Sequence, residues 1–307
     1  MVGTSKNPPK EKAVTAIQDV FVLSPPTLAS YIETMTAYAD QQPLFKCYRG
    51  QRNSAWDSIP GLLRPEYAEL ARNEKRAVRD LVSVHPREFA EDETMFDRLV
   101  RMQHFGLPSR LLDVSQNPLV ALYFATDPGP DKEASDGAVT AFAIPERREK
   151  YFDSDAVSCL ANLANMTEAE KKEIVGIGRL SKGTPKADEI FRINDESVYQ
   201  RLHQFIRAEK AHFLPIIDPT DLFKPYYVHP KMSNRRILSQ AGGFIIHGLV
   251  PPRKIRFAHP IEEKKFVIPS DAKKPLRKAL ELLGISDSTL FPELDRAANR
   301  IKLSYSA

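Results

Sequence analysis

The stretch QHFGLPSRLLDVSQNPLVALYFA, at residues 103–125, sets three structural elements in quick succession. A glycine and a proline end the helix that leads into it, because neither residue continues a helix well. Residues 109–114 then predict a short strand, and Asn117 with the proline after it opens a strongly apolar helix over 119–126. The polar side chains of this stretch therefore gather where a helix, a strand and a second helix meet.

Outward from this stretch, helical and extended patterns follow one another without a regular order. Residues 66–104 predict two helices broken at a His-Pro pair, and another helix begins near Ser24. Further strands are expected at 43–50, 138–144, 213–217, 226–228, 244–247 and 265–268, and further helices at 233–238 and 273–283. This mixture favours an α+β fold over a doubly wound one, with a small mixed sheet as its core, helical insertions and a C-terminal helix.

The length of 307 residues and the apolar fraction of 42% suit one large domain with a sizeable core. We expect a flexible tail over 1–18, a single domain over 19–300 with a helical insertion at about 150–210, and a second tail over 301–307. No apolar run approaches the length of a membrane span, the first residues lack the apolar core of a secretory signal, and the two cysteines form no CxxC pair. The sequence therefore predicts a cytoplasmic protein without a membrane partner.

Positive charge is concentrated in one part of the chain. The net charge is only +4, but residues 224–278 hold 13 basic and three acidic residues, a local net charge of +10. Such a segment indicates a phosphate-bearing partner, nucleic acid among them. The alternative is a solvated surface whose charge is balanced by acidic neighbours in the fold.

Several signatures of common enzyme classes are missing. The sequence has no GxxxxGK[ST], no GxGxxG after a strand, no HExxH, no GxSxG and no Cys/His spacing typical of a metal site. P-loop ATPases, Rossmann enzymes, zincins and α/β-hydrolases are therefore disfavoured, and no metal is expected.

Two constellations carry the chemistry that remains. In the first, Arg49 lies at a strand end beside Gly50, where a planar guanidinium suits a phosphate and the glycine lets the backbone approach it. The alternative is an ordinary surface arginine beside a turn glycine. The second is the stretch 103–119, whose residues 113–117 precede a helix, where free N–H groups and the helix dipole favour an anion.

Structural roles are the alternatives for the second constellation. Ser115 would then cap the helix that follows it, and His104 would cap the end of its own helix. Arg110 and Asp113 would form a structural ion pair.

The chain resembles the FRG domain family. The family's name motif is present as Tyr48-Arg49-Gly50-Gln51, and its block QHxGxPTRLLDWTxNPLxALYFA is similar to residues 103–125, with Val114 and Ser115 in place of tryptophan and threonine. Residues 136–139 are similar to the strand that follows, residues 236–244 to RIxxQxGxF, and residues 290–295 to LFPDLD. The resemblance covers roughly residues 45–300.

A looser similarity connects this pattern with ADP-ribosyltransferases of the Arg-Ser-Glu type. That resemblance implies an ADP-ribosyltransferase-like fold and NAD as a substrate, with Arg49, Ser115 and Gln240 in the places of the family's arginine, serine and glutamate. Gln240 departs from the pattern because a neutral amide does not stabilise a developing cation by charge, so Asp113 is expected to supply the carboxylate. The resemblance further implies NAD-binding roles for Tyr48, Gly50, Gln51, His104, Arg110, Asn117 and Tyr123.

The resemblance implies an NAD-dependent ADP-ribosyltransferase that acts on nucleic acid or protein, in the manner of a toxin in antiphage or toxin–antitoxin defence, with an antitoxin as a further partner. The alternative is a non-catalytic module that senses nucleotides or nucleic acid, with Arg49 and Arg110 as phosphate ligands. A metal-dependent nuclease is the weakest hypothesis, because the acids near the motifs are not paired as metal ligands. We expect Arg49, Asp113, Asn117 and Gln240 to meet in one cleft, since each lies at the end of an apolar element.

Overall fold

The structure is a computed structural model. It describes residues 19–41, 44–129, 135–180, 187–232, 234–250 and 258–292. The expected tails at 1–18 and 301–307 lie outside these residues.

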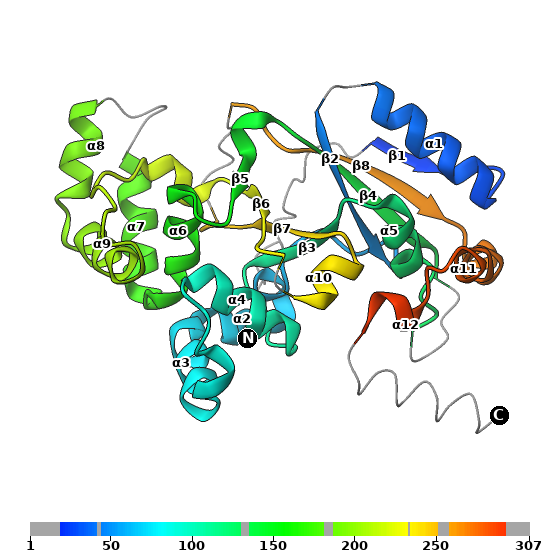
Figure 1. The fold of residues 1–307 in the computed structure, drawn as a ribbon. Helices are drawn as coiled ribbons and strands as arrows, with labels where there is room; N and C mark the ends of the chain where they lie inside the picture. The colour runs from blue at the N-terminus through cyan, green and yellow to red at the C-terminus, as the bar shows by residue number, and fades with distance from the viewer. Residues whose placement is uncertain are drawn as a thin grey trace, which may run out of the picture.

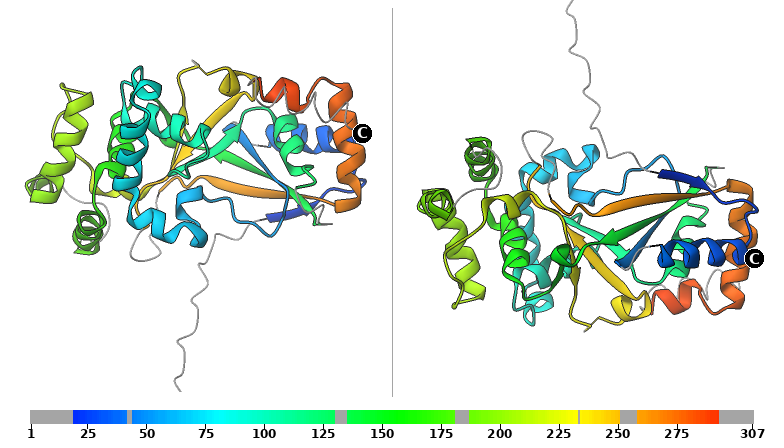
Figure 2. Two further views of the ribbon diagram at one scale, coloured as in Figure 1. Left: turned by 90° about the horizontal axis from the view of Figure 1, so that it is seen from below. Right: turned by 90° about the horizontal axis from the view of Figure 1, so that it is seen from above.

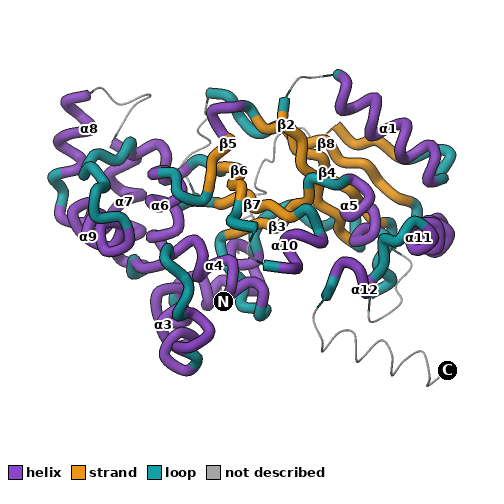
Figure 3. The backbone as a smooth tube through the Cα atoms, in the orientation of Figure 1, coloured by secondary structure: helices purple, strands orange, loops and turns teal. Residues whose placement is uncertain are grey.

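The described chain forms mixed α/β structure around one eight-stranded sheet, with the strand order β1-β8-β4-β2-β3-β7-β6-β5 (Figures 1 and 3). The strands are β1 (Asp19–Val22), β2 (Phe45–Gln51), β3 (Leu111–Ser115), β4 (Gly137–Ile144), β5 (Glu149–Tyr151), β6 (Tyr226–His229), β7 (Gly242–Ile246) and β8 (Glu262–Ile268). The two outermost pairs, β1 with β8 and β5 with β6, are parallel, and the inner pairs are antiparallel.

The sheet is divided between its two central strands. Strand β2 pairs with β4 from Phe45 to Gln51, along its whole length, but it pairs with β3 only at Tyr48, opposite Ser115. Beyond this single pair the two strands separate. The sheet therefore consists of two four-stranded halves that are paired only at Tyr48 and Ser115. Residues of β2 and β3 beyond this pair face a gap, because no backbone hydrogen bonds connect the two strands there.

Helix α5 (Pro118–Ala125) lies directly on one of these halves. A Cβ atom at Gly50 of β2 would fall 1.8 Å from the carbonyl oxygen of Ala121, and one at Gly137 of β4 would fall 2.1 Å from that of Ala125. The backbone of α5 therefore packs directly against the backbone of β2 and β4 at these two glycines, where any side chain would collide with it. Around it, α1 (Leu28–Asp40) and α11 (Lys273–Leu282) complete an apolar core.

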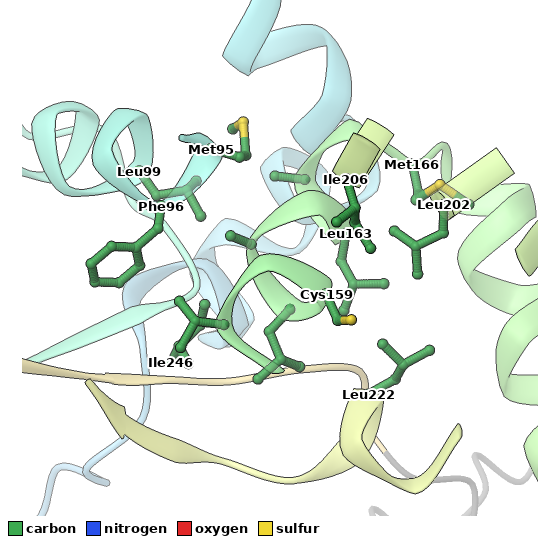
Figure 4. Close-up of a cluster of buried hydrophobic side chains, with 14 of the residues drawn as sticks. Met95, Phe96, Leu99, Cys159, Leu163, Met166, Leu202, Ile206, Leu222 and Ile246 are labelled. Carbon is green, nitrogen blue, oxygen red and sulfur yellow. The ribbon is translucent and has the colours of Figure 1, made fainter. Parts of the chain in front are cut away.

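The other half of the sheet carries a helical lobe, which Figure 2 shows at one end of the molecule. Helix α4 (Met95–His104) packs there with α6 (Asp155–Asn162) and α9 (Ser197–Glu209), joining Phe96, Leu160 and Ile206 in one buried cluster (Figure 4). The lobe also contains α2 (Ala68–Arg72), α3 (Glu74–Val84), α7 (Glu168–Leu180) and α8 (Ala187–Asn194). The stretch expected to form a helical insertion thus supplies α6 to α9.

The secondary structure corrects two expectations. The sheet is larger than the small one predicted, because the edge strands β1 and β5 were not expected. The strand predicted at 213–217 is wrong: this stretch is a loop, with Pro215 at its centre lacking the N–H that a ladder requires. The Asn194 side chain takes the place of a strand partner, since it accepts from Ile217 N at 2.8 Å and donates to Ile217 O at 2.9 Å. Among the described residues, no helix combines the length and apolar character that crossing a membrane requires.

Candidate functional site

A cavity of about 180 Å³ lies where β2 and β3 separate. Arg49, Asp113 and Gln240 line it, from β2, β3 and the end of α10 (Arg235–Ser239), so three of the four residues expected to share a cleft do so. Asn117 is not among the lining residues. The complete lining within the described chain is Tyr48, Arg49, Gly50, Asp113, Val114, Ser115, Ala121, Phe124, Arg236 and Gln240.

Arg49 bridges the two halves of the sheet with its side chain. Its Nη1 donates to the backbone carbonyl of Asp113 at 2.7 Å, and its buried Nε has no partner among the described residues. Burial lowers the pKa of the guanidinium; the Asp113 carboxylate opposes that effect, whereas the positive charge of Arg64 adds to it. Arg49 is therefore a cation held at the gap with unused donor capacity.

Asp113 presents a carboxylate to the same cavity. It is the exposed residue in the middle of a strand that is otherwise buried. Within the described part of the chain, the carboxylate makes neither an ion pair nor a hydrogen bond, and the interaction with Arg49 runs through the backbone oxygen. The carboxylate remains available to a ligand.

Ser115 and Gln240 are engaged in local structure. The Ser115 hydroxyl accepts from Asn117 N at 2.9 Å and donates to the carbonyl of Gln240 at 2.7 Å, joining the turn before α5 to the turn after α10. The Gln240 amide donates from Nε2 to Leu290 O at 3.0 Å. Asn117, rather than Ser115, caps α5, since its Oδ1 accepts from Leu119 N at 2.9 Å.

The residues beside Arg49 in the name motif make mainly packing contacts. Tyr48 is buried against α5, and Gly50 lets the backbone of that helix approach the strand. Gly50 also lines the cavity, so its expected role beside a phosphate stays a prediction. Gln51 is buried, where its Nε2 donates to Asp57 O at 3.1 Å and its Oε1 accepts from Ser58 Oγ at 3.1 Å.

The structure places Arg110 in a buried ion network rather than at the cavity. Its guanidinium forms two hydrogen bonds with the carboxylate of Glu74, which also accepts from Lys171, and donates to His247 O at 3.1 Å. The alternative pairing of Arg110 with Asp113 is wrong, and so is the expectation that Arg110 contacts a phosphate, because its donors are used inside the fold.

His104 and Tyr123 also lie outside the cavity. His104, at the end of α4, bonds through Nδ1 with Asn234 Nδ2 at 2.9 Å and stacks on Phe105. Tyr123 is buried in the core beside α11, with the Arg277 guanidinium 3.9 Å from its ring centroid.

A larger groove, of about 580 Å³, continues from this cavity between α4 and α10. A small pocket links the two, and Arg236 lines all three spaces. Sequence reasoning placed Arg236 only in a family motif. The signal that would have found it is its spacing of four residues from Gln240, which puts both on one face of a short helix. The groove carries Glu91, Asp92, Glu93 and Asp97 together with Arg101, Lys231, Arg235 and Arg236.

The basic segment at 224–278 does not form one free surface. Lys265 and Lys273 are buried, and their ammonium groups donate to the backbone oxygens of Trp56 and Arg52 at 3.2 and 2.6 Å. Lys224 and Lys231 form ion pairs with aspartates and glutamates. Arg253, Lys254 and Arg256 lie outside the described residues. Much of the charge thus serves the fold, although Lys274 and Lys278 on α11 are exposed.

A family model matches part of the chain. Residues 46–134 match the model of the FRG domain, in agreement with the resemblance of the sequence motifs. The matched region includes Arg49 and Asp113, whereas Arg236 and Gln240 lie beyond its end. Neither a curated protein nor a solved structure matches the chain. Among the described residues, no group of three His, Cys, Asp or Glu side chains is placed to hold a metal ion.

Proposed function

We propose that this chain, which carries the FRG domain match, is an ADP-ribosyltransferase-like enzyme that uses NAD as its substrate at the cavity between β2 and β3. The observation that carries the proposal is the meeting of Arg49 with the unpaired carboxylate of Asp113 in one cavity. A guanidinium with spare donors suits a diphosphate or a ribose hydroxyl. An unpaired carboxylate suits the positive charge that develops on the ribose when its bond to nicotinamide breaks.

In the proposed reaction, nicotinamide departs with the electron pair of its bond to the ribose C1′, and a nucleophile of the acceptor attacks that carbon and loses its proton. Asp113 stabilises the developing cation, and Arg49 holds the substrate. Ser115 and Gln240 act as positioning residues, because their hydrogen bonds fix the turns on either side of the cavity. Gln240 Oε1 remains able to accept from a ribose hydroxyl.

The size of the site is consistent with a substrate that is only partly enclosed. A cavity of about 180 Å³ is smaller than the usual small-molecule site of roughly 300–1,000 Å³. NAD would therefore extend into the adjoining groove of about 580 Å³. The acceptor is a nucleic acid or a protein, and the family resemblance favours a toxin with a matching antitoxin.

A non-catalytic nucleotide-binding module is the second candidate. It is favoured by the engagement of Ser115 and Gln240 in structural hydrogen bonds, which leaves Asp113 without a partner side chain for acid–base work. The two candidates differ in whether NAD is consumed.

The test is to incubate the full chain and cell extract with NAD labelled in its adenylate phosphate. Label on protein, RNA or DNA, together with free nicotinamide, supports the transferase and identifies its acceptor class. Asp113→Asn should keep ADP-ribose binding but lower transfer by about 10²- to 10³-fold, the usual loss for one electrostatic group. Asp80→Asn, at an exposed site on α3, is the matched control. Binding of ADP-ribose without nicotinamide release would favour the non-catalytic module.

A further inference from the structure

Arg236 is a second arginine at the cavity, and it comes from the opposite half of the sheet. Arg49 belongs to β2, whereas Arg236 lies in the first turn of α10, which leads into β7. Both line the cavity of about 180 Å³ at the gap between the halves. The Arg49 side chain crosses the gap to the backbone of Asp113 on β3, so a ligand in that cavity meets the guanidiniums of both arginines although they come from different halves of the sheet.

Among the described residues, the arginines around this gap outnumber the carboxylates, since Asp113 faces Arg49, Arg64 and Arg236. Neither Arg49 nor Arg236 forms an ion pair with a carboxylate of the described chain, and Arg64 lies close enough to lower the pKa of Arg49 further. Among the described residues, Asp113 supplies the only carboxylate of the cavity lining. Both side chains are half-buried, and a bound anion would offset the free-energy cost of partly desolvating an arginine that has no carboxylate partner.

Arg236 is held in place by the segment around α12 (Asp287–Leu290). Its guanidinium carbon lies 5.0 Å from the ring centroid of Phe291, within cation–π range. Phe291 is buried and packs edge-on against Phe124, a residue of the cavity lining, at 5.9 Å. The carbonyl of Leu290 accepts from Ser239 Oγ and Gln240 Nε2, both at 3.0 Å. The Phe291 ring thus contacts the Arg236 side chain, and the two hydrogen bonds to Leu290 hold the end of α10 against the same segment.

We propose that Arg49 and Arg236 form a two-arginine clamp for the diphosphate of the substrate, with Phe291 as the positioning residue of Arg236. The proposal rests on the proposed function, because it names the part of the nucleotide that the same cavity holds. Each guanidinium offers a planar pair of donors that matches two phosphate oxygens. Two such groups lining one cavity suit a ligand with two linked phosphates better than one with a single phosphate.

The test compares pyrophosphate with inorganic phosphate, and ADP-ribose with AMP, by calorimetric titration of the full chain. We expect the diphosphates to bind more tightly than the monophosphates. Arg236→Gln should lower diphosphate affinity by about 10- to 100-fold, the range for losing a charged hydrogen bond, and should remove the preference over monophosphates. Arg192→Gln is the matched control, because Arg192 is an exposed arginine of α8 that lines neither the cavity nor the groove.

Phe291 tests the positioning step. Phe291→Leu removes the ring face while keeping an apolar side chain and should weaken diphosphate binding several-fold, whereas Phe291→Tyr keeps the face and should restore it. Thermal unfolding of each variant separates loss of the clamp from loss of the fold. A structural role alone would not alter the ratio of diphosphate to monophosphate affinity.

The outcomes separate this proposal from the proposed function. If the diphosphate preference depends on Arg236 but NAD is never consumed, the clamp stands and the transferase fails. If NAD is consumed and Arg236→Gln behaves like the unmodified chain, the clamp is overturned and the transferase stands. Equal losses in Arg192→Gln and Arg236→Gln, or no binding of pyrophosphate and ADP-ribose to the unmodified chain, also overturn the clamp.

Discussion

Arg49 is the residue on which the proposed chemistry depends most directly. Its Nη1 is committed to the Asp113 carbonyl, while its buried Nε has no partner among the described residues. We expect Arg49→Ala to abolish NAD turnover, and Arg49→Lys to lose at least about tenfold in ADP-ribose affinity, because a point charge does not reproduce a planar pair of donors. Calorimetric titration and nicotinamide release measure the two effects. Near-full activity of Arg49→Lys would show that the planar pair of donors of the guanidinium is not needed for binding.

Glu74 is the residue that balances the buried cations of the helical lobe. Its carboxylate accepts from Arg110 and Lys171, and all three side chains are buried. Replacing it with glutamine would leave two buried charges unpaired, so Glu74→Gln should lower the free energy of unfolding by about 3–5 kcal/mol. Glu69→Gln, at an exposed helix position, should change it by no more than about 0.5 kcal/mol. Urea unfolding at neutral pH provides the comparison.

The same network gives the stability a pH dependence. Burial by itself raises the pKa of Glu74, but the charges and hydrogen bonds of Arg110 and Lys171 outweigh it and hold the pKa below its ordinary value of 4.5. The stabilisation is therefore complete above pH 4.5 and is lost as the pH falls through the lowered pKa. Urea unfolding between pH 6 and pH 3 should show the unmodified chain losing more stability than Glu74→Gln. Parallel losses in both proteins would contradict this assignment.

At the scale of elements, the close contact of α5 with the sheet limits which side chains β2 can carry at Gly50. A methyl group at Gly50 would fall 1.8 Å from Ala121 O, and this atom is backbone and has little room to move. Gly50→Ala should therefore destabilise the protein by about 3 kcal/mol or more, at or beyond the upper end of usual overpacking costs. Gly176→Ala, in an exposed turn of α7 with open space around it, should instead stabilise by roughly 0.5–1 kcal/mol. Thermal unfolding of both variants measures the contrast.

At the scale of the whole molecule, fewer basic residues of the segment 224–278 are available to a partner than the sequence contains, because several are buried or form ion pairs. If the chain binds RNA or DNA through α11, the double variant Lys274→Glu with Lys278→Glu should reduce the dependence of log affinity on log salt by about 0.7–0.9 for each phosphate that the protein no longer neutralises. Nicotinamide release in solution should be unchanged, because the cavity lies elsewhere. Charge reversal at Lys273 should instead impair folding, since its ammonium group is buried against Arg52 O. Fluorescence anisotropy with labelled oligonucleotides across a salt series tests both statements.

The sequence alone determined the local elements around the site. The glycine and proline that end α4, the buried strand β3 and the Asn-Pro start of α5 follow from residue chemistry within a few positions, and the structure has all three where they were expected. The FRG resemblance was readable in the same way over roughly residues 45–300, and the family model matches residues 46–134 of that range. Local signals succeed here because caps, turns and apolar periodicity act between residues that are near one another in the chain.

Only the tertiary structure decided which polar residues share a site. Sequence reasoning grouped Arg110 with Asp113, but Arg110 pairs with Glu74, and Arg236 takes a place at the cavity that no local pattern assigned to it. The prediction of a strand at 213–217 was wrong for a related reason. The Asn194 side chain of α8 bonds to the backbone N–H and carbonyl of Ile217, which the pattern had predicted to pair within a sheet. Pairing of charges and satisfaction of backbone groups are settled by whichever partners the packed fold brings near, and those partners lie tens to more than a hundred residues away.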